Sequence, residues 1–475
     1  MTDKTIDQLN DGGKLRPTDL VPVRRGSATL KANLGYGAPL SRRIAVIGTS
    51  LVQQNDAASD DSFRISHANR GWLSWLRAYS KGAIECPVWH DETVVAGWEP
   101  SGVSGASRLF RGLNFGVSGQ TIDQIRARLP YIEANFLDHF TDIVIDGGTN
   151  DMGTETKENI QDDREYIATW FLERGKTVHF LPILSREVSS WASGGTQRRS
   201  AHWINQKTVE FCQKNFQCFF LDWNAPFVDG GDADGQPKAG YTHDGTHFDN
   251  RGGEAVGEFM ANYFKPLLPP TAPRVLSNDD IYDATNNPFG CLINNPMLLG
   301  TGGNNSDAKV SGDLADGMEL EARKSGTTTC VASKEAKANG GEYQVLTFAN
   351  VDATAQEFYF RTDTTNVIHA MANKWVQASV DIETNDSDAI ENVSLVLDDI
   401  SGTDGNFSED FYKTGNETWI PKERDLRLIT PPILMKADST TLRIRVVVWI
   451  KGSPSVAPVV KISNLEVRQI PDPTF

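Results

Sequence analysis

Five short, almost uninterrupted apolar runs constrain the fold of the first half of this chain most strongly. They are 44–47, 113–115, 143–145, 178–181 and 218–221. Stretches with helical periodicity lie between them, and the clearest of these are 157–174 and 200–216. Strands that are apolar on both faces and alternate with helices are typical of a parallel sheet covered on both sides. The pattern therefore predicts an α/β domain of three layers, α/β/α, over residues 41–268.

The character of the sequence changes after a proline-rich break. A linker is expected over 269–280, and helical periodicity almost disappears in 281–475. Runs such as 344–348, 393–397 and 442–448 are instead rich in β-forming residues, and the last begins with strict alternation of apolar and charged side chains. Alternation of this kind indicates antiparallel strands with one solvent-facing side. We predict a β-sandwich, jelly-roll-like, for this half of the chain.

Two further segments stand apart from these patterns. Residues 1–40 are rich in Gly, Pro and polar side chains, so we expect an extended N-terminal arm. The stretch 55–111 is long and rich in Trp. It is interpreted either as an insertion that shapes a binding cleft or as an irregular covering layer. The sequence leaves open which of the two it is, and whether this stretch or the sandwich determines specificity.

Composition narrows the functional classes. With 46 Lys and Arg against 62 Asp and Glu, the formal net charge is −16, which disfavours nucleic-acid binding because phosphate contacts need a positive surface. No apolar run approaches the roughly 18 residues that cross a bilayer, and the first residues lack the apolar core of a signal peptide. The five cysteines are scattered without metal-ligand spacing, so we interpret them as buried thiols rather than as disulfides or a zinc site.

Four short polar segments carry the candidate chemistry: 48–51, 118–121, 148–151 and 244–247. Three of them follow predicted strands, and the fourth lies in the loop region after the last strand. Because loops at the carboxyl ends of parallel strands converge on one edge of the sheet, where ligands bind, we expect these segments to meet. Together they contain a serine, backbone amides, a side-chain amide and an acid–histidine pair, which are the groups that acyl transfer requires.

Ser50 is the predicted nucleophile. A serine hydroxyl reacts at neutral pH only when an imidazole accepts its proton and a carboxylate holds that imidazole in the correct tautomer. His247 is the predicted general base and Asp244 its orienting acid, because their i, i+3 spacing places both on one side of a turn. His243 adjoins the acid but has the wrong spacing for this role.

Three groups are predicted to form an oxyanion hole: the backbone N–H of Ser50, the backbone N–H of Gly119 and the side-chain amide of Asn150. Glycine at position 119 is explained by a close backbone approach that leaves no room for a Cβ atom. A plain turn glycine and an ordinary loop asparagine are the competing interpretations. Asp151 is interpreted as a structural residue that caps the segment following it.

These four segments resemble the motif blocks of the SGNH hydrolase superfamily, also called the GDSL esterase/lipase family. The resemblance covers about 43–265 and implies the same α/β/α fold. The roles that it implies are nucleophile for Ser50, oxyanion donors for Gly119 and Asn150, and completion of the triad by Asp244 and His247. Thr49 and Gln120 depart from the family pattern, in which aspartate is usual at the first position and frequent at the second. Neither position supplies a catalytic atom, so the departures concern subfamily and substrate.

The N-terminal arm carries a second resemblance. Segments 5–9 and 17–23 are similar to the N-terminal region of many bacteriophage tail fibre and tailspike proteins. The C-terminal half is similar to carbohydrate-binding sandwiches on phage-associated hydrolases. The resemblance implies a virion protein that reaches extracellular glycans without a signal peptide, attaches to a tail or baseplate protein through its arm, and is compatible with a homotrimer.

The resulting hypothesis is a phage tail esterase that removes O-acetyl groups from a bacterial capsule or O-antigen and needs no metal or cofactor. The sandwich would hold glycan through exposed aromatic side chains, with Trp375, Trp419 and Trp449 as candidates and core packing as the alternative for each. Asp398, Asp399 and Asp404 are interpreted as solvated turn residues rather than calcium ligands, since their spacing matches no calcium loop. The rival functions are a bacterial carbohydrate or lipid esterase unrelated to phage, a glycan-binding adhesin without turnover, and a structural tail subunit.

Overall fold

The structure is a computed structural model that describes most of the chain. The described residues are 20–25, 28–33, 42–59, 64–91, 110–268, 275–338, 340–362, 368–369, 371–399, 406–439 and 441–474. Several predicted features lie outside them, namely the arm motif at 5–9, residues 17–19 of the second motif, 92–109 of the Trp-rich stretch, 269–274 of the linker, and Asp404. Near the N-terminus, β1 (Leu20–Arg25) pairs antiparallel with β2 (Ala28–Asn33).

A parallel sheet forms the centre of the first half, as predicted. Its strands are β3 (Arg42–Gly48), β6 (Ile84–Glu85), β9 (Asn114–Gly116), β10 (Asp142–Ile145), β11 (Thr177–Phe180) and β12 (Cys218–Phe220). The order is β12-β11-β10-β3, and both β6 and β9 then pair with β3. Every pairing is parallel, which confirms the predicted sheet.

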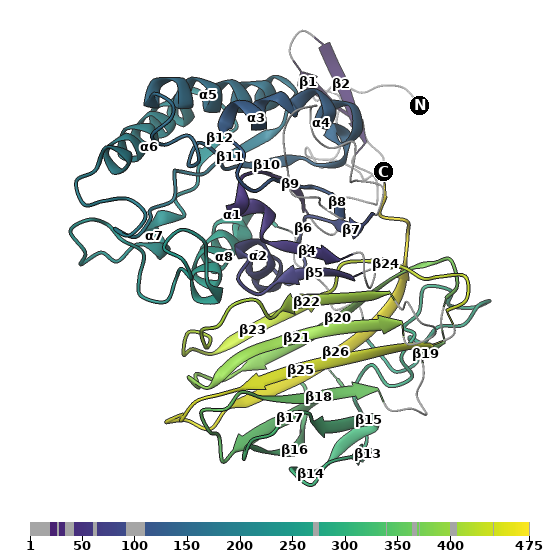
Figure 1. Cartoon of the computed structure of the whole chain (residues 1–475). Helices are drawn as coiled ribbons and strands as arrows, with labels where there is room; N and C mark the ends of the chain where they lie inside the picture. Colours follow the sequence, from purple (N-terminus) through teal and green to yellow (C-terminus); the bar gives the residue numbers. More distant parts are fainter. Residues whose placement is uncertain are drawn as a thin grey trace, which may run out of the picture.

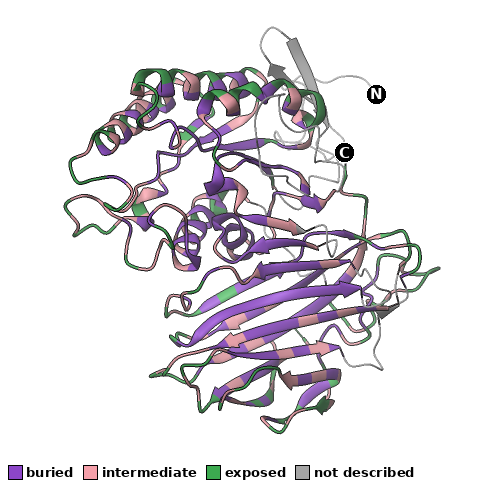
Figure 2. Cartoon of the chain, in the orientation of Figure 1, coloured by how far each residue is buried: buried purple, intermediate pink, exposed green. Residues whose placement is uncertain are grey.

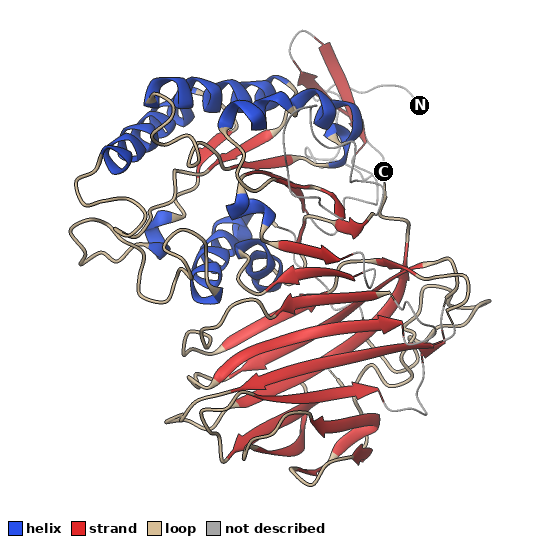
Figure 3. Cartoon of the chain, in the orientation of Figure 1, coloured by secondary structure: helices blue, strands red, loops and turns tan. Residues whose placement is uncertain are grey.

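Helices cover both faces of this sheet. They are α1 (Ser50–Gln53), α2 (Trp72–Tyr79), α3 (Ile122–Ala127), α4 (Leu129–Asn135), α5 (Lys157–Glu173), α6 (Thr196–Lys214), α7 (Asn224–Phe227) and α8 (Asn250–Phe264), with short 3-10 turns η3 (Leu137–His139) and η4 (Lys265–Leu267). Helices α3 to α6 lie on the outer face, whereas α2 and α8 lie between the sheet and the second half of the chain (Figures 1 and 3). The three-layer α/β/α prediction is therefore confirmed.

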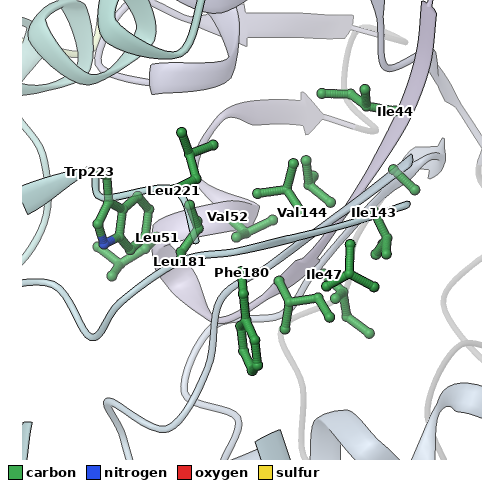
Figure 4. Close-up of a cluster of buried hydrophobic side chains, with 14 of the residues drawn as sticks. Ile44, Ile47, Leu51, Val52, Ile143, Val144, Phe180, Leu181, Leu221 and Trp223 are labelled. Atoms are coloured by element: carbon green, nitrogen blue, oxygen red, sulfur yellow. The ribbon is translucent and has the colours of Figure 1, made fainter. Parts of the chain in front are cut away.

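One hydrophobic core joins the sheet to its helices. Ile47, Val144 and Phe180 come from three neighbouring strands and are fully buried. Leu51 and Val52 of α1 pack into the same cluster (Figure 4). Burial of each large aliphatic side chain contributes about 1.5–3 kcal/mol to stability. The core therefore holds α1, and with it the residue that begins α1, in a defined position at the end of β3.

Two stacked sheets form the second half, which confirms the predicted β-sandwich. The larger sheet has the order β13-β15-β18-β25-β21-β22-β5-β4, with β19 beside β25. Its strands from this half are β13 (Gly302–Asn305), β15 (Leu314–Ala322), β18 (Gln356–Thr362), β19 (Ile368–His369), β21 (Ile390–Asp399), β22 (Phe407–Tyr412) and β25 (Thr441–Ile450). Most of the pairings are antiparallel. Figure 2 shows buried residues running along its central strands.

The smaller sheet lies against the larger one and has the order β14-β16-β17-β26-β20-β23, with β24 beside β20. Its strands are β14 (Val310–Gly312), β16 (Thr329–Ala336), β17 (Glu342–Ala349), β20 (Trp375–Thr384), β23 (Arg424–Ile429), β24 (Ile433–Leu434) and β26 (Val459–Ile470). A second hydrophobic cluster fills the space between the sheets. Trp419 is fully buried in it, so the core-packing alternative holds for this residue, whereas Trp375 and Trp449 are half-buried.

The described part of the Trp-rich stretch, 55–59 and 64–91 with 110–111, includes regular strands and a helix, and part of it links the two halves. Its strands β4 (Asp56–Ser59) and β5 (Arg64–Ala68) make a hairpin, and β5 pairs in parallel with β22 of the sandwich. Outside these two sheets, β7 (Val88–His90) pairs with β8 (Phe110–Gly112). The predicted domain boundaries stay a prediction, but the hairpin places part of the N-terminal half within the sandwich sheet.

The structure confirms the prediction that the cysteines are buried thiols. All five cysteines are free and buried. The Sγ atoms of Cys212 and Cys218 lie 3.3 Å apart. Among the helices of the described residues, none is both long and apolar enough to cross a membrane.

Candidate active site

Ser50 lies at the carboxyl end of β3, where it begins α1 and is 8% exposed. Thr49 caps this helix, because its side-chain oxygen accepts a hydrogen bond from the Leu51 N–H. The Thr49 hydroxyl and N–H both donate to Asp146 Oδ2, at 2.8 and 3.2 Å. Asp146 follows β10, so a contact between two adjacent strand ends fixes the turn that presents Ser50. The threonine that departs from the family pattern therefore has a clear structural function.

A chain of hydrogen bonds connects Ser50 to the loop that precedes α8. Ser50 Oγ lies 2.8 Å from His247 Nε2, and His247 Nδ1 lies 2.7 Å from Asp244 Oδ2. The loop is closed by a β-bridge between Thr242 and Phe248. The structure thus brings together the three residues predicted as nucleophile, base and acid, in the order that proton transfer requires. Their catalytic roles stay predictions.

The surroundings of Asp244 keep its carboxylate charged. Partial burial raises its pKa, but hydrogen bonds from the His247 N–H and ring, the charge of that ring and the Thr246 N–H together lower the pKa to about 2. The two backbone N–H groups donate to Oδ1 at 2.8 and 3.0 Å. Oδ2 is then left to accept from the imidazole. Asp244 is therefore ionised across the neutral range and holds the Nδ1–H tautomer of His247, which leaves Nε2 free to accept the Ser50 proton.

Two of the predicted oxyanion donors are backbone N–H groups, one of the buried Ser50 at the start of α1 and one of Gly119 in an exposed turn. Among the described residues, the N–H groups of Ser50 and Gly119 have no hydrogen-bond acceptor. Gly119 has a φ of +78°, and a Cβ atom at this position would meet nothing within 4 Å. No protein atom of the described residues lies close enough to exclude a Cβ atom, and the left-handed backbone by itself favours glycine here; the close approach of an oxyanion stays a prediction.

Asn150 ties the second and third polar segments together. Its Nδ2 donates to the Gln120 carbonyl at 2.9 Å, which uses one of its two amide hydrogens. The Ser118 N–H, in the same turn as Gly119, donates to Gln53 Oε1 of α1 at 2.5 Å. The turn that carries Gly119 is therefore attached both to the serine helix and to the asparagine loop, so the three predicted donor segments form one connected unit.

Asp151 is structural, as predicted, but it caps a different segment. Its two carboxylate oxygens accept from the Ile122 N–H at 3.0 and 3.1 Å, so it caps α3 and not the stretch that follows it in sequence. Burial raises its pKa to about 6. The contact links the asparagine loop to the helix after the Gly119 turn, which sequence spacing alone does not indicate.

His243 lies close to the triad without taking part in it. Its Nδ1 pairs with the Phe248 carbonyl at 3.0 Å, and its ring stacks on His247 with centroids 5.8 Å apart. His243, Asp244 and His247 have potential ligand atoms within 4.8 Å of one another. However, the 2.7 Å between His247 Nδ1 and Asp244 Oδ2 is a hydrogen bond, shorter than the about 3.3 Å between ligands of a tetrahedral zinc ion. The geometry fits proton transfer better than metal binding.

The sequence analysis did not identify the segment 186–187, which forms hydrogen bonds to two of the polar segments. Glu187 donates its N–H to the Gly245 carbonyl at 3.0 Å, in the middle of the Asp244–His247 turn. Arg186 donates from a terminal nitrogen to Thr149 Oγ1 at 2.7 Å, beside Asn150. The segment follows β11 at the same carboxyl edge of the sheet as the other loops, and that position was the signal that could have identified it.

The sandwich supports the same region. Asp249, two residues after His247, accepts from the Asn416 N–H of the sandwich at 3.2 Å. Asn250 and Arg251, at the start of α8, donate to backbone carbonyls of Glu417 and Thr418. The loop between β22 and β23 therefore contacts the chain directly after the catalytic turn.

Comparisons with known proteins place the fold in context. No family model matches the chain, and no curated protein matches it. Among solved structures, it is similar to a GDSL-like lipase from Bacteroides thetaiotaomicron, with 16% identity, 48% of this chain and 89% of that chain covered, and a TM-score of 0.33. It is also similar to a carbohydrate esterase family 3 protein from Talaromyces cellulolyticus, with 15% identity, 48% of this chain and 97% of that chain covered, and a TM-score of 0.30. The psychrotrophic esterase EstA from Pseudoalteromonas is 12% identical, with 48% of this chain and 98% of that chain covered and a TM-score of 0.32.

Proposed function

We propose that this protein is a serine ester hydrolase that acts through an acyl-enzyme on Ser50. The observation that carries the proposal is the 2.8 Å contact between Ser50 Oγ and His247 Nε2, continued by the 2.7 Å contact between His247 Nδ1 and Asp244. A serine becomes nucleophilic when such a base accepts its proton, and a fixed carboxylate holds the base in the orientation and tautomer that this transfer needs. The site is placed at the carboxyl edge of a parallel sheet, where α/β proteins bind ligands.

In this mechanism His247 accepts the Ser50 proton while Oγ attacks the ester carbonyl carbon. The carbonyl oxygen becomes an oxyanion, which the N–H groups of Ser50 and Gly119 and the amide of Asn150 stabilise. His247 then donates the proton to the departing alkoxide, and the C–O bond of the ester breaks. In the second half-reaction His247 accepts a proton from water, and the resulting hydroxide attacks the acyl carbon. The bond between that carbon and Oγ then breaks, His247 returns the proton to Oγ, and the carboxylic acid leaves.

For the substrate, we propose O-acetyl groups on a bacterial capsule or O-antigen, removed by a phage tail component. The similarity of segments 5–9 and 17–23 to tail fibre and tailspike proteins supports this context. A second domain of sandwich architecture, with Trp375 and Trp449 half-buried, offers a surface for glycan. A tail or baseplate protein would bind the arm, and the homotrimer typical of such fibres is the proposed assembly.

Two tests separate the rival functions. Purified protein should release acetate from an acetylated polysaccharide and from a small acetyl ester, and Ser50→Ala should abolish both reactions while glycan binding persists. A serine-directed phosphonate should label Ser50 in the wild type only. Binding without acetate release and without labelling would identify an adhesin. Equal activity towards lipid esters, with no preference for acetylated glycans, would favour the esterase unrelated to phage.

A further inference from the structure

Arg186 presents a partly free guanidinium group beside the candidate active site. Its carbonyl accepts from Arg198 at 2.7 Å, which fixes the backbone, and its guanidinium stacks on Trp191 at 4.8 Å. Of its five N–H groups, one donates to Thr149 Oγ1 at 2.7 Å. The remaining donors make no hydrogen bond to the described residues and are not buried. Arg186 therefore offers several unused donors next to the predicted oxyanion loop.

A second arginine, Arg70, lies close to the serine helix α1 and to α8. It lies in the turn between β5 and α2, and two residues later the Trp72 indole donates to the Leu51 carbonyl of α1 at 3.1 Å. The Arg70 carbonyl packs so closely on α8 that a Cβ atom at Gly253 would be 2.3 Å from it. Its Nε is buried without a hydrogen-bond partner in the described residues, while its terminal nitrogens are not buried.

Neither guanidinium has an ion-pair partner among the described residues. Burial lowers the pKa of both arginines, and the charge of Asp244 raises both, with Asp249 adding to the effect on Arg70 and Asp146 to that on Arg186. Both cations are therefore within electrostatic reach of the predicted acid Asp244, and no carboxylate of the described residues binds them. A half-buried arginine without a counterion has lost part of its hydration energy, and the attraction of a bound anion would compensate that loss.

The negative net charge of the chain strengthens the argument that these two cations bind an anion. The chain carries a formal net charge of −16, so the molecule as a whole repels anions. A local positive site within such a molecule attracts an anionic ligand to the place where it lies. The planar fork of arginine matches a carboxylate by two parallel hydrogen bonds.

We propose that Arg70 and Arg186 bind a carboxylate of the substrate, so that the preferred substrate is an acylated acidic sugar such as an O-acetylated uronic acid. This inference rests on the proposed esterase function and assigns the two arginines as specificity-determining residues. The carboxylate of the sugar ring would be held between them while an ester on the same or the neighbouring sugar faces Ser50. Neither arginine changes protonation in the reaction.

The experiment compares two substrates that differ only in charge. They are an O-acetylated methyl glucuronoside and its primary carboxamide, with kcat/KM measured for each. The wild type should prefer the acid by about tenfold or more, and Arg186→Gln and Arg70→Gln should each reduce that preference severalfold, mainly through KM. Arg186→Lys should retain part of it. Arg199→Gln, an exposed arginine on α6 of the same domain, is the matched control and should keep the full preference.

Each remaining outcome decides the question. No preference for the acid in the wild type, or an unchanged preference in both glutamine variants, overturns the proposal while leaving the esterase intact. A stronger preference for an acetylated sugar phosphate overturns the carboxylate assignment. If the wild type hydrolyses no ester, the proposed function fails separately, and calorimetry with the same acid and carboxamide then tests the site: acid binding that Arg186→Gln weakens supports it, and equal binding of both ligands overturns it.

Discussion

Trp72 and Trp75 lie one turn apart on the same short helix, yet they belong to two different hydrophobic cores. Trp72 packs in the core of the parallel sheet, where its ring contacts Trp223 edge-on at 6.3 Å. Trp75 packs in the core of the sandwich, at 5.0 Å from Trp419 and 4.5 Å from Phe411. Helix α2 therefore packs in both hydrophobic cores, and it joins the two halves of the protein.

This arrangement predicts that the halves do not fold independently. A fragment of residues 42–268 would expose the Trp75 face of α2 and an unpaired β5 edge, so we expect it to aggregate or to remain partly unfolded. In the full chain, Trp75→Ala should cost about 3–5 kcal/mol in the free energy of unfolding. Trp203→Ala, on the half-exposed side of α6, is the control and should cost less. Denaturant unfolding followed by circular dichroism measures both, and a soluble, cooperatively folding fragment would contradict the prediction.

A buried ion pair across the same interface gives a second prediction. Arg424 of β23 makes two hydrogen bonds to Glu254 of α8, at 2.7 and 3.0 Å, and both side chains are fully buried. Arg424→Met leaves Glu254 charged and without its main partner, so we expect a loss of about 3–5 kcal/mol in stability. The double variant with Glu254→Gln should recover part of that loss. Lys81→Met, which breaks the exposed pair with Asp425, should cost at most about 1 kcal/mol.

Stability should fall as the pH rises through neutrality. Burial raises the pKa of Asp410 and that of Glu409 to about 7, whereas the unfolded chain titrates near the ordinary carboxyl values of about 4. Between these limits the folded state binds more protons than the unfolded state, so the free energy of unfolding decreases with increasing pH. Asp410→Asn should reduce this slope between pH 5 and 8. Urea unfolding at several pH values provides the measurement, and an identical slope in the variant would refute the assignment.

The triad should behave as one unit in mutant kinetics. Asp244→Asn removes the acceptor that holds the His247 tautomer, so we expect kcat to fall by about 10²–10⁴-fold. The double variant with His247→Ala should lose about as much kcat as His247→Ala alone, because Asp244 acts only through the imidazole. Asp162→Asn, an exposed carboxylate on α5, serves as the control. Losses that multiply in the double variant would show that the two residues do not act together.

Asn150 allows the oxyanion prediction to be separated from stability. Asn150→Ala removes one predicted donor, and a single donor of this kind is worth about 10²–10³ in kcat. The melting temperature should change little, because the side chain makes one hydrogen bond, to Gln120. A normal kcat in a stable variant would return Asn150 to the alternative of an ordinary loop residue.

Much of the site could be predicted because its residues follow strands that local patterns define. The apolar run at 44–47 predicts β3, and a loop at its carboxyl end must face the same edge as the loop after β10. That topology brings Ser50 and Asn150 to one region before any coordinates are known. The target of Asp151 was mistaken and the left-handed backbone of Gly119 was not foreseen, since contacts between loops and backbone torsion are not encoded by spacing.

The sequence by itself determined five strands of the parallel sheet, the two longest helices α5 and α6, the change of architecture after the proline-rich break and the residue types of the triad. Periodic burial of apolar side chains is a local property and can be read along the chain. Only the tertiary structure decided that β5 pairs with β22, more than 300 residues away in sequence. It also decided that the segment containing Arg186 lies beside the Asp244–His247 turn, where the Glu187 N–H donates to the Gly245 carbonyl. Pairing at a sheet edge and the environment of a charge arise from segments that meet only in the folded chain, because no local pattern specifies which distant surface will cover them.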